Sequence, residues 1–504
     1  MALAWCGCSS GDPVARLTSQ LGESAHRERA IDAMLILVRQ TPAKQRAQVK
    51  QRVVNALMEA YREDTARPQI VAALALLKDG RAEEVFVAAL KDAERGGPYF
   101  EASVRSARMI GELGLKKQVP VLLKSLEQRL ASPRDDRNTW LERSLIQALE
   151  RLADRRAVPV LIKALKADPA RMDFYISRMA AHALGTLRDA RAVDALVASL
   201  GATSHGLLLY EESRRALCRI GAPSIKGLSS VAWRRDRRQR PVANAPAAVR
   251  LLADLGAVDL TTKLMSLPRP DDPAELRLAV AQTLLRLGRR DADRLALDLV
   301  QDQKSSVTSR RCAADLLGWY GAADSVAPLL APSCSKADAA GQLLCWSVAL
   351  AHSRVAGAEG TAALDKLLAT RQDEATRHHL GVCRARLAMV TTCADQPGCY
   401  ERQLTSAADW REQERAALEL GRSGSALPLA RHLAQAHPQV KQAILVGLEQ
   451  QQLQPPQNSE VRQALRALID SKVKDTGPHG VTPPAIVGRA LCLDERLERT
   501  REKR

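Results

Sequence analysis

A short apolar phrase recurs along this chain of 504 residues at an almost regular step. Two clear copies read ALERLADRRAVPVLIKAL, ending at Leu165, and ALGTLRDARAVDALVASL, ending at Leu200. Equivalent apolar positions, separated by 32 to 39 residues, are Leu74, Ile110, Leu149, Leu184, Leu217, Leu252, Leu284, Leu317 and Leu350. Such a step predicts a solenoid, because a single unit of this size buries its apolar face only against its neighbours.

Each unit is expected to be a pair of helices. A second apolar column lies three residues after the first, for example at Leu152 and Leu187, and this spacing puts both columns on one helix face. In the best copies the first helix covers residues 158–165 and the second covers 177–187. Aromatic residues are only 3% of the chain while 46% is hydrophobic, so helix-forming Ala and Leu dominate the predicted core. No apolar run is long enough to predict a membrane-spanning helix.

The repeated phrase resembles HEAT repeats, especially the short class of the phycobilisome lyases, over roughly residues 25–450. The sequence patterns of ankyrin and tetratricopeptide repeats are missing, although their periods are similar. The resemblance implies an all-α fold, a right-handed α–α superhelix of about eleven or twelve helix pairs. It says little about function, because such repeats serve many roles.

The predicted organisation has three parts. Residues 1–24 form an N-terminus and tether, 25–450 the solenoid, and 451–504 an irregular region ending in a charged helix that either caps the stack or frays. Polar or Pro-rich stretches interrupt the solenoid at 127–139, 233–247 and 266–273. Insertions of this kind are where regular solenoids place partner-specific features.

The chain is strongly basic, with a formal net charge of +18, which suits acidic partners. Its densest basic cluster lies in the 233–247 interruption, where several arginines could recognise carboxylates or phosphates. The predicted partner-binding residues are Trp233, Arg234, Arg235, Arg237, Arg238 and Arg240. The alternative is a solvated loop without a binding role.

The cysteines bear on the cellular compartment. Cys393 and Cys399 flank the Pro397–Gly398 reversal, which predicts a disulfide and thus an oxidising compartment; two free thiols are the alternative. Cys312 and Cys345 lie one repeat apart and are expected to be buried helix residues.

The first residues, MALAWCGCSSG, resemble the end of a bacterial lipoprotein signal. The resemblance implies lipidation at Cys8, followed by a flexible tether, and a location facing the periplasm. An ordinary cytosolic N-terminus is the alternative.

Motifs for catalysis are not found. The chain has no His-Glu dipeptide, the metal-binding motif of the deoxyhypusine hydroxylases, which this architecture also resembles. We therefore predict a non-catalytic protein-interaction scaffold without metal or cofactor, anchored at the bacterial envelope and binding protein partners, some of them acidic. The alternatives are a cytosolic nucleic-acid-binding protein and a HEAT-repeat enzyme related to the hydroxylases or bilin lyases; either would need its own site.

Overall fold

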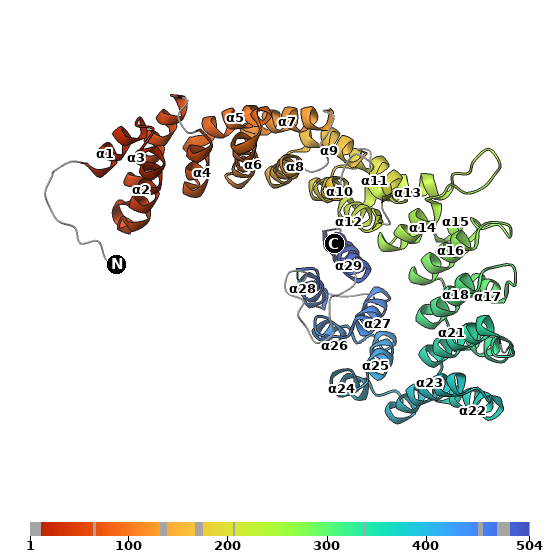
Figure 1. Ribbon diagram of the computed structural model, residues 1–504. Coiled ribbons are helices and arrows are strands. Elements are labelled where there is room, and N and C mark those ends of the chain that lie inside the picture. Colours follow the sequence, from red (N-terminus) through yellow and green to blue (C-terminus); the bar gives the residue numbers. More distant parts are fainter. Residues whose placement is uncertain are drawn as a thin grey trace. The chain divides into compact units, whose positions relative to one another are not determined.

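The computed structural model describes residues 12–63, 67–131, 139–166, 175–204, 207–336, 338–451, 457–470 and 484–502. The chain divides into two compact units, where the sequence predicted one continuous solenoid. Unit 1 comprises residues 1–195 and 204–207, and unit 2 comprises residues 196–203 and 208–504. Both units consist of antiparallel helices stacked in two layers, so the all-α solenoid is confirmed (Figure 1).

The helices of unit 1 are α1 (Pro13–Leu21), α2 (Arg27–Gln40), α3 (Ala43–Arg62), α4 (Arg67–Leu77), α5 (Glu83–Lys91), α6 (Gly97–Glu112), α7 (Val119–Ala131), α8 (Trp140–Leu152), α9 (Val158–Leu165) and α10 (Tyr175–Leu187). Its 3-10 turns are η1 (Gly80–Ala82), η2 (Asp92–Arg95), η3 (Lys116–Gln118), η4 (Arg155–Ala157) and η5 (Ala190–Ala192). Helix α11 (Val193–Ser199) and the two-residue strands β1 (Thr203–Ser204) and β2 (Leu207–Leu208) span the division between the units.

Unit 2 continues the pattern with α12 (Tyr210–Ile220), α13 (Ala222–Ala232), α14 (Ala245–Asp254), α15 (Thr261–Met265), α16 (Ala274–Arg286), α17 (Asp293–Gln301), α18 (Val307–Tyr320), α19 (Ala323–Val326), α20 (Leu330–Ser333), α21 (Ala339–Val355), α22 (Thr361–Thr370), α23 (Glu374–Cys393), α24 (Pro397–Ser406), α25 (Trp410–Arg422), α26 (Ala426–His432), α27 (Pro438–Glu449), α28 (Gln457–Asp470) and α29 (Pro484–Glu502). Its 3-10 turns are η6 (Val258–Leu260), η7 (Arg290–Ala292), η8 (Ala327–Leu329) and η9 (Ala358–Gly360).

An Asp-x-Arg turn starts several first helices of the repeat. Asp189 accepts a hydrogen bond from the backbone N–H of Arg191 and holds its guanidinium at 2.7 and 2.9 Å. The side-chain hydrogen bond from Arg191 lowers the pKa of Asp189 to about 2. Asp79 and Asp154 make the same contacts three repeats and one repeat earlier. The same geometry in the three repeats caps each turn with an ionised carboxylate.

The apolar columns read from the sequence form the core. Every member of the first column from Leu74 to Leu317 is fully buried. Leu350, the next member, is only half-buried, because it lines a cavity in unit 2. Helices α6 and α8 approach closely at Gly111, where a Cβ would lie 2.7 Å from the Cα of Ala148. The stacking that the repeat step requires is therefore present.

The described residues change two details of the predicted organisation and include the predicted C-terminal helix. Residues 13–21, expected to be a tether, form α1, and its Val14 and Leu21 are buried. Residues 127–131, expected to be a loop, continue helix α7; residues 132–138 lie outside the described part. At the other end, most side chains of α29 from Ile486 to Leu497 are buried, so this helix caps the stack.

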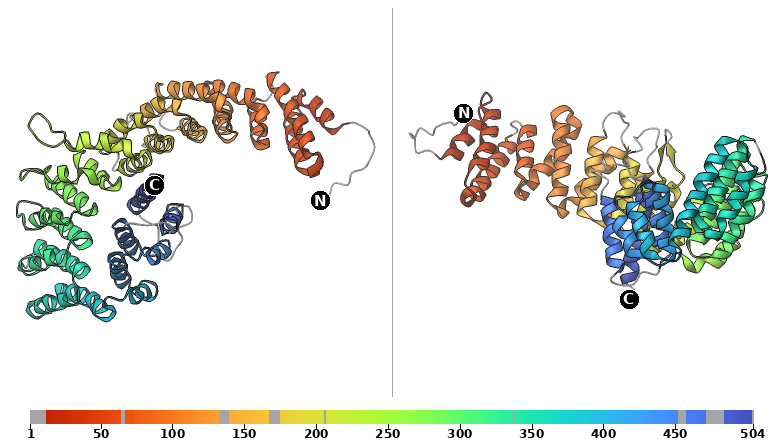
Figure 2. Two further views of the ribbon diagram at one scale, coloured as in Figure 1. Left: turned by 180° about the vertical axis from the view of Figure 1, so that it is seen from behind. Right: turned by 90° about the horizontal axis from the view of Figure 1, so that it is seen from below.

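Unit 2 closes on itself through α29. This last helix packs against α28 and α27, which precede it, and against α12 and α14, the first inner helices of the unit. Figure 2 shows the blue C-terminal helices lying beside the yellow-green start of unit 2. Among the described residues, no helix is both long and apolar enough to cross a membrane.

Candidate interaction surfaces

The predicted basic cluster forms an ordered loop between α13 and α14. Arg234, Arg237, Arg238 and Arg240 are exposed, and the Lys263 ammonium lies 4.8 Å from the centre of the half-buried Trp233 ring. Figure 1 shows this loop projecting on the side of the first helices of the repeats, away from the inner helices. The cluster therefore does not face the inner surface of unit 2.

Two of the six predicted residues are engaged in holding the loop together. Arg235 donates to both carboxylate oxygens of Asp272, at 2.7 and 2.8 Å, and to the carbonyl of Leu267. Its side chain is only 12% exposed and fixes the loop to the 266–273 segment, while its role in partner binding stays a prediction. Arg240 pairs with Asp236 at 2.9 Å but stays exposed.

The inner helices of unit 1 carry a different surface, which we call the aromatic–basic face. It extends over α6, α8 and α10, which pack side by side. Its members are Phe100, Arg105 and Arg108 of α6, Trp140 and Arg143 of α8, and Tyr175 and Arg178 of α10. Each helix presents this face because its opposite side supplies the buried apolar column.

An arginine joins the two exposed rings of this face. The Arg143 guanidinium lies 4.6 Å from the centre of the Trp140 ring and 4.3 Å from that of Tyr175, and it donates to the Tyr175 hydroxyl at 3.3 Å. Trp140 is 55% exposed and Tyr175 is 40% exposed. Two large rings are thus held in place by a cation–π contact while their outer sides stay open to solvent.

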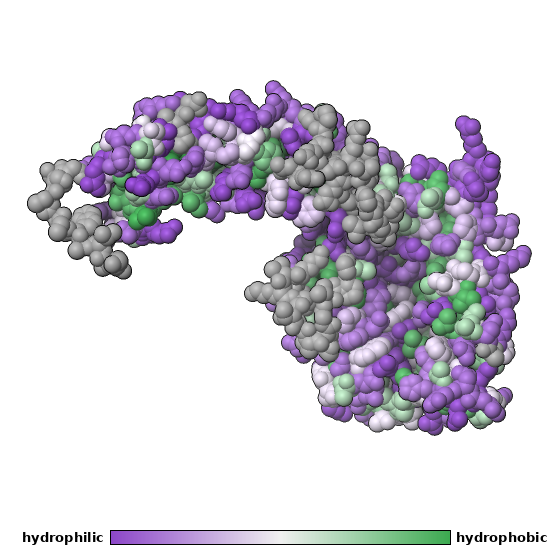
Figure 3. Space-filling view, viewed as in Figure 1, coloured by the Kyte–Doolittle hydropathy of each residue, from purple (hydrophilic) through white to green (hydrophobic). Residues whose placement is uncertain are grey.

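A cleft of about 710 Å³ opens beside Trp140, between α6 and α8. Arg105 and Arg108 line it, and neither forms an ion pair with any residue that the structure describes. Glu101 is the single acidic residue among the described residues of its lining. In the view of Figure 3, apolar patches interrupt the hydrophilic surface over the inner helices of unit 1, where Ile36 and Leu76 are also exposed.

Sequence reasoning missed this face, although a signal was present. Trp140 and Tyr175 lie 35 residues apart, each nine positions before a member of the first apolar column, Leu149 and Leu184. The repeat register therefore places both rings at the same height on neighbouring helices. Taken one at a time, the tryptophans of this chain look dispersed.

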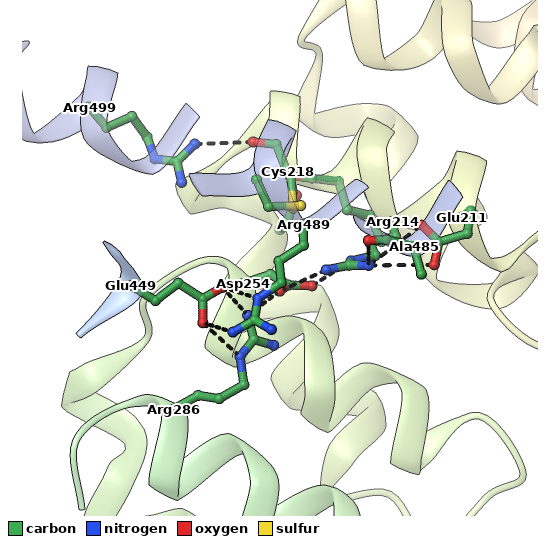
Figure 4. Close-up of a disulfide and its surroundings, with 12 residues drawn as sticks. Glu211, Arg214, Cys218, Asp254, Arg286, Glu449, Ala485, Arg489 and Arg499 are labelled. Carbon is green, nitrogen blue, oxygen red and sulfur yellow. Dashed lines mark hydrogen bonds and ion pairs between the residues drawn. A yellow bond between two sulfur atoms is a disulfide. The ribbon is translucent and has the colours of Figure 1, made fainter. Parts of the chain in front are cut away.

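The inner helices of unit 2 instead bury a ladder of alternating charges (Figure 4). Asp254 accepts from Arg214 at 2.7 Å and from Arg286 at 2.7 Å. Glu449 in turn accepts from Arg286 at 2.8 Å and from Arg489 at 2.7 Å. The ladder joins α12, α14, α16, α27 and α29, so it connects the first and last helices of the unit.

The charges of this ladder stabilise one another. Burial alone would raise the pKa of Glu449, but the guanidinium groups of Arg286 and Arg489 outweigh it and hold that pKa well below its usual range. For Asp254, Arg214 and Arg286 likewise outweigh the effect of burial and lower the pKa. Both carboxylates are therefore ionised at neutral pH, as a buried ion-pair network requires.

Three disulfides lie within unit 2. Cys393 and Cys399, the pair expected from the sequence, are joined with their Cα atoms 5.4 Å apart. Cys345 is buried but bonded to Cys334, and Cys312 is an exposed free thiol, so the expectation of two equivalent buried helix cysteines is wrong. Cys8, the predicted lipidation site, lies outside the described residues.

The third disulfide, Cys218–Cys492, joins residues 274 positions apart on α12 and α29 (Figure 4). No sequence signal indicates this pair, because the contact arises only when unit 2 closes. These two sulfurs and Asp254 make the one group in the described part of the chain with metal-ligand spacing. Joined to each other, the sulfurs are not the thiolates that bind metals.

Comparisons with known proteins support the fold. Residues 126–212 match the family model of HEAT repeats. A search of curated protein sequences finds no match. The CpcE–CpcF complex of phycocyanin lyase from Nostoc sp. PCC7120 is 20% identical over 60% of this chain and 94% of that chain, with a TM-score of 0.22.

Two other similar structures cover different shares of the chain. The karyopherin Kap121p, bound to the extreme C-terminus of the protein phosphatase Cdc14p, is 10% identical over 96% of this chain and 75% of its own, with a TM-score of 0.41. Human deoxyhypusine hydroxylase is 16% identical over 61% of this chain and 96% of its own, with a TM-score of 0.22. At these values the structures carry no inference about function. Residues 126–212 therefore match HEAT repeats, and similar helix pairs are stacked on both sides of this segment.

Proposed function

We propose that this protein is a non-catalytic scaffold whose aromatic–basic face binds an acidic segment of a partner protein at the bacterial cell envelope. The observation that carries the proposal is the pair of exposed rings, Trp140 and Tyr175, both held by contact with Arg143. Tryptophan, tyrosine and arginine are the residues that dominate binding energy at protein interfaces. Rings held in place also lose little conformational entropy on binding.

The charge of the face selects the partner. Among the described residues of the cleft beside Trp140, Arg105 and Arg108 stand against the single carboxylate of Glu101. An acidic chain with apolar side chains would place carboxylates on the arginines and apolar groups on the rings. The net charge of +18 would attract such a partner at long range.

The envelope location rests on cysteine chemistry. Six of the eight cysteines in the described part of the chain are paired in disulfides, which persist in oxidising compartments. This agrees with the lipoprotein-like start of the sequence, in which Cys8 would carry the lipid. Intact mass of protein from the membrane fraction would report lipidation, and Cys8→Ser should move the protein to the soluble fraction. A soluble wild-type protein with an unmodified Cys8 would reject this part.

The matched pair Trp140→Ala and Trp233→Ala tests the face. We expect Trp140→Ala to weaken the capture of crosslinked partners about thirtyfold, the effect of losing about 2 kcal/mol at an interface hot spot. Trp233→Ala, on the outer loop, should leave the partner set unchanged. If the two variants behave in the opposite way, the 233–247 loop is the binding site. If neither changes the partner set, the scaffold binds through another surface.

Nucleic acid is the alternative ligand, because exposed rings between arginines can also stack on unpaired bases. A single-stranded oligonucleotide and an acidic peptide separate the two ideas. Oligonucleotide binding at about 50 mM salt that weakens steeply with added salt would favour nucleic acid. Binding of the peptide alone supports the protein partner.

A further inference from the structure

A cavity of about 470 Å³ lies on the inner helices of unit 2, separate from the aromatic–basic face. Five successive inner helices, α18, α21, α23, α25 and α27, contribute to its lining. We call it the Arg386 pocket and define it by Asp315, Trp319, Arg354, Arg386, Trp410 and Glu414. Two of these residues, Asp315 and Trp319, lie one helical turn apart on α18 and so share a face.

The floor of the pocket is a buried cluster of charges. Glu414 is completely buried and accepts a hydrogen bond from Arg354 Nε at 2.6 Å. Arg386, only 2% exposed, reaches the same carboxylate with Nη1 at 3.5 Å. The two arginines outweigh the burial of Glu414 and lower its pKa, so the carboxylate is charged.

One carboxylate does not satisfy Arg386. Its Nε and Nη2 atoms are buried and donate to no acceptor among the described residues. Nη2 lies 3.3 Å from a Glu414 oxygen but outside hydrogen-bonding geometry. A buried guanidinium with two unused donors is costly unless an acceptor fills the space in front of it. Arg386 lines the cavity, and an anion bound there would supply that acceptor once the guanidinium turns toward it.

The charge balance limits which anion fits. Among the described residues of the lining, three arginines, Arg354, Arg386 and Arg411, outnumber two carboxylates, Asp315 and Glu414, by one charge. A carboxylate matches this excess, whereas a doubly charged phosphate would be repelled by the two acids. Carboxylates also match the planar donor fork of arginine.

The walls indicate what the carboxylate is attached to. Trp319 and Trp410 are half-buried in the lining, and Leu350 adds an aliphatic contact. One side of Trp319 is covered by the Arg354 guanidinium at 3.9 Å, and Trp410 stacks on His437 at 4.8 Å. The rings are therefore fixed in position, as in sites for apolar or aromatic groups.

We propose that the Arg386 pocket binds an aryl or alkyl carboxylate, with the carboxylate on Arg386 and the apolar body against Trp319 and Trp410. The source is either a free small acid or the C-terminal carboxylate of a peptide that ends in an aromatic residue. Binding requires no covalent chemistry.

Calorimetric titration with phenylacetate, and with its neutral analogue phenylacetamide, tests the proposal. Phenylacetate should bind to the full-length protein at least tenfold more tightly, because only the acid accepts charge-assisted hydrogen bonds. The peptide acetyl-Ala-Gly-Phe, with a free or an amidated C-terminus, identifies the source. Tighter binding of the free peptide than of phenylacetate points to a chain terminus, and the reverse order points to a small acid.

Arg386→Gln should lower phenylacetate affinity about tenfold to hundredfold, the range for one charged hydrogen bond. The control is Arg384→Gln, on the same helix, where the side chain pairs with Asp365 outside the pocket and should leave affinity unchanged. If Arg386→Gln fails to fold by circular dichroism, Arg411→Gln replaces it. Arg411 is 42% exposed at the pocket, and its loss should weaken binding about two- to fivefold.

Three results would overturn the proposal. The first is equal affinity for acid and amide in both pairs of compounds. The second is wild-type affinity for phenylacetate in a folded Arg386→Gln variant, or in Arg411→Gln where Arg386→Gln does not fold. The third is no binding of either acid at about 10 mM, since a weaker site would not be occupied in a cell.

Discussion

Replacing Cys218 and Cys492 together by alanine removes the covalent link between the first and last inner helices of unit 2. An open solenoid frays from its ends, because terminal repeats have only one neighbour. The disulfide prevents this by joining the two ends of unit 2 directly, across 274 positions of sequence. The double variant should therefore expose α29 to local unfolding.

The loop length gives the size of the effect. In the chain-entropy relation, a crosslink over 274 residues stabilises the folded state by roughly 5–6 kcal/mol. The same relation gives about 3 kcal/mol for Cys334–Cys345, over 11 residues. All four sulfur-bearing side chains are at most 2% exposed, so the loss of packing is similar in the two double variants. The difference between them isolates loop closure.

Urea unfolding without reductant, followed by circular dichroism, would measure both double variants against the wild type. Hydrogen exchange should show the largest loss of protection in α29, while the helices around Cys334 keep theirs. The reasoning is refuted if removing Cys218–Cys492 costs no more than removing Cys334–Cys345. Unchanged exchange in α29 would show that its noncovalent contacts alone hold it.

Other substitutions test separate parts of the structure. Gly421→Ala should destabilise unit 2 by about 1–3 kcal/mol in urea unfolding, because the added Cβ would lie 2.6 Å from the Cα of Gly447. Gly381→Ala has open space around the added Cβ and should stabilise helix α23 by up to about 1 kcal/mol. Arg235→Ala should cost about 1–3 kcal/mol by leaving Asp272 unpaired, whereas Arg238→Ala should change stability little. The folded-state pKa of Glu449 is depressed, so its contribution to stability is present above the normal pKa of a glutamate and is lost as the pH falls through the folded value. Urea unfolding between neutral and acidic pH should show this decrease in the free energy of unfolding. The decrease should be smaller in the Glu449→Gln variant.

The repeat pattern predicted the fold because it is local. A column that runs from Leu74 to Leu317 is set by contacts between neighbouring repeats, and all of its members in this range are buried. The helix bounds follow for the same reason: α9 covers Val158–Leu165 as expected. Fold and core could therefore be derived from periodicity without any long-range information.

The features that the pattern could not predict depend on contacts between distant parts of the chain. Arg235 was predicted to bind a partner from its place in a basic cluster, and its contact with Asp272, 37 positions later, is seen only in the structure. Likewise, the Cys218–Cys492 bond and the Arg286–Glu449 ion pair need a closed unit 2. Closure of a solenoid is set by small rotations summed over many repeats, and no local motif records that sum.

The two units use their inner helices for different purposes. In unit 1 these helices carry Trp140 and Tyr175, whose exposure leaves interface energy available for a partner. In unit 2 they carry Asp254 and Glu449, whose charges are consumed in ion pairs that hold α29 in place. A surface that already satisfies its own charges gains little by binding a protein. Large partners are therefore expected on unit 1, and the Arg386 pocket is a place where unit 2 retains unused donors.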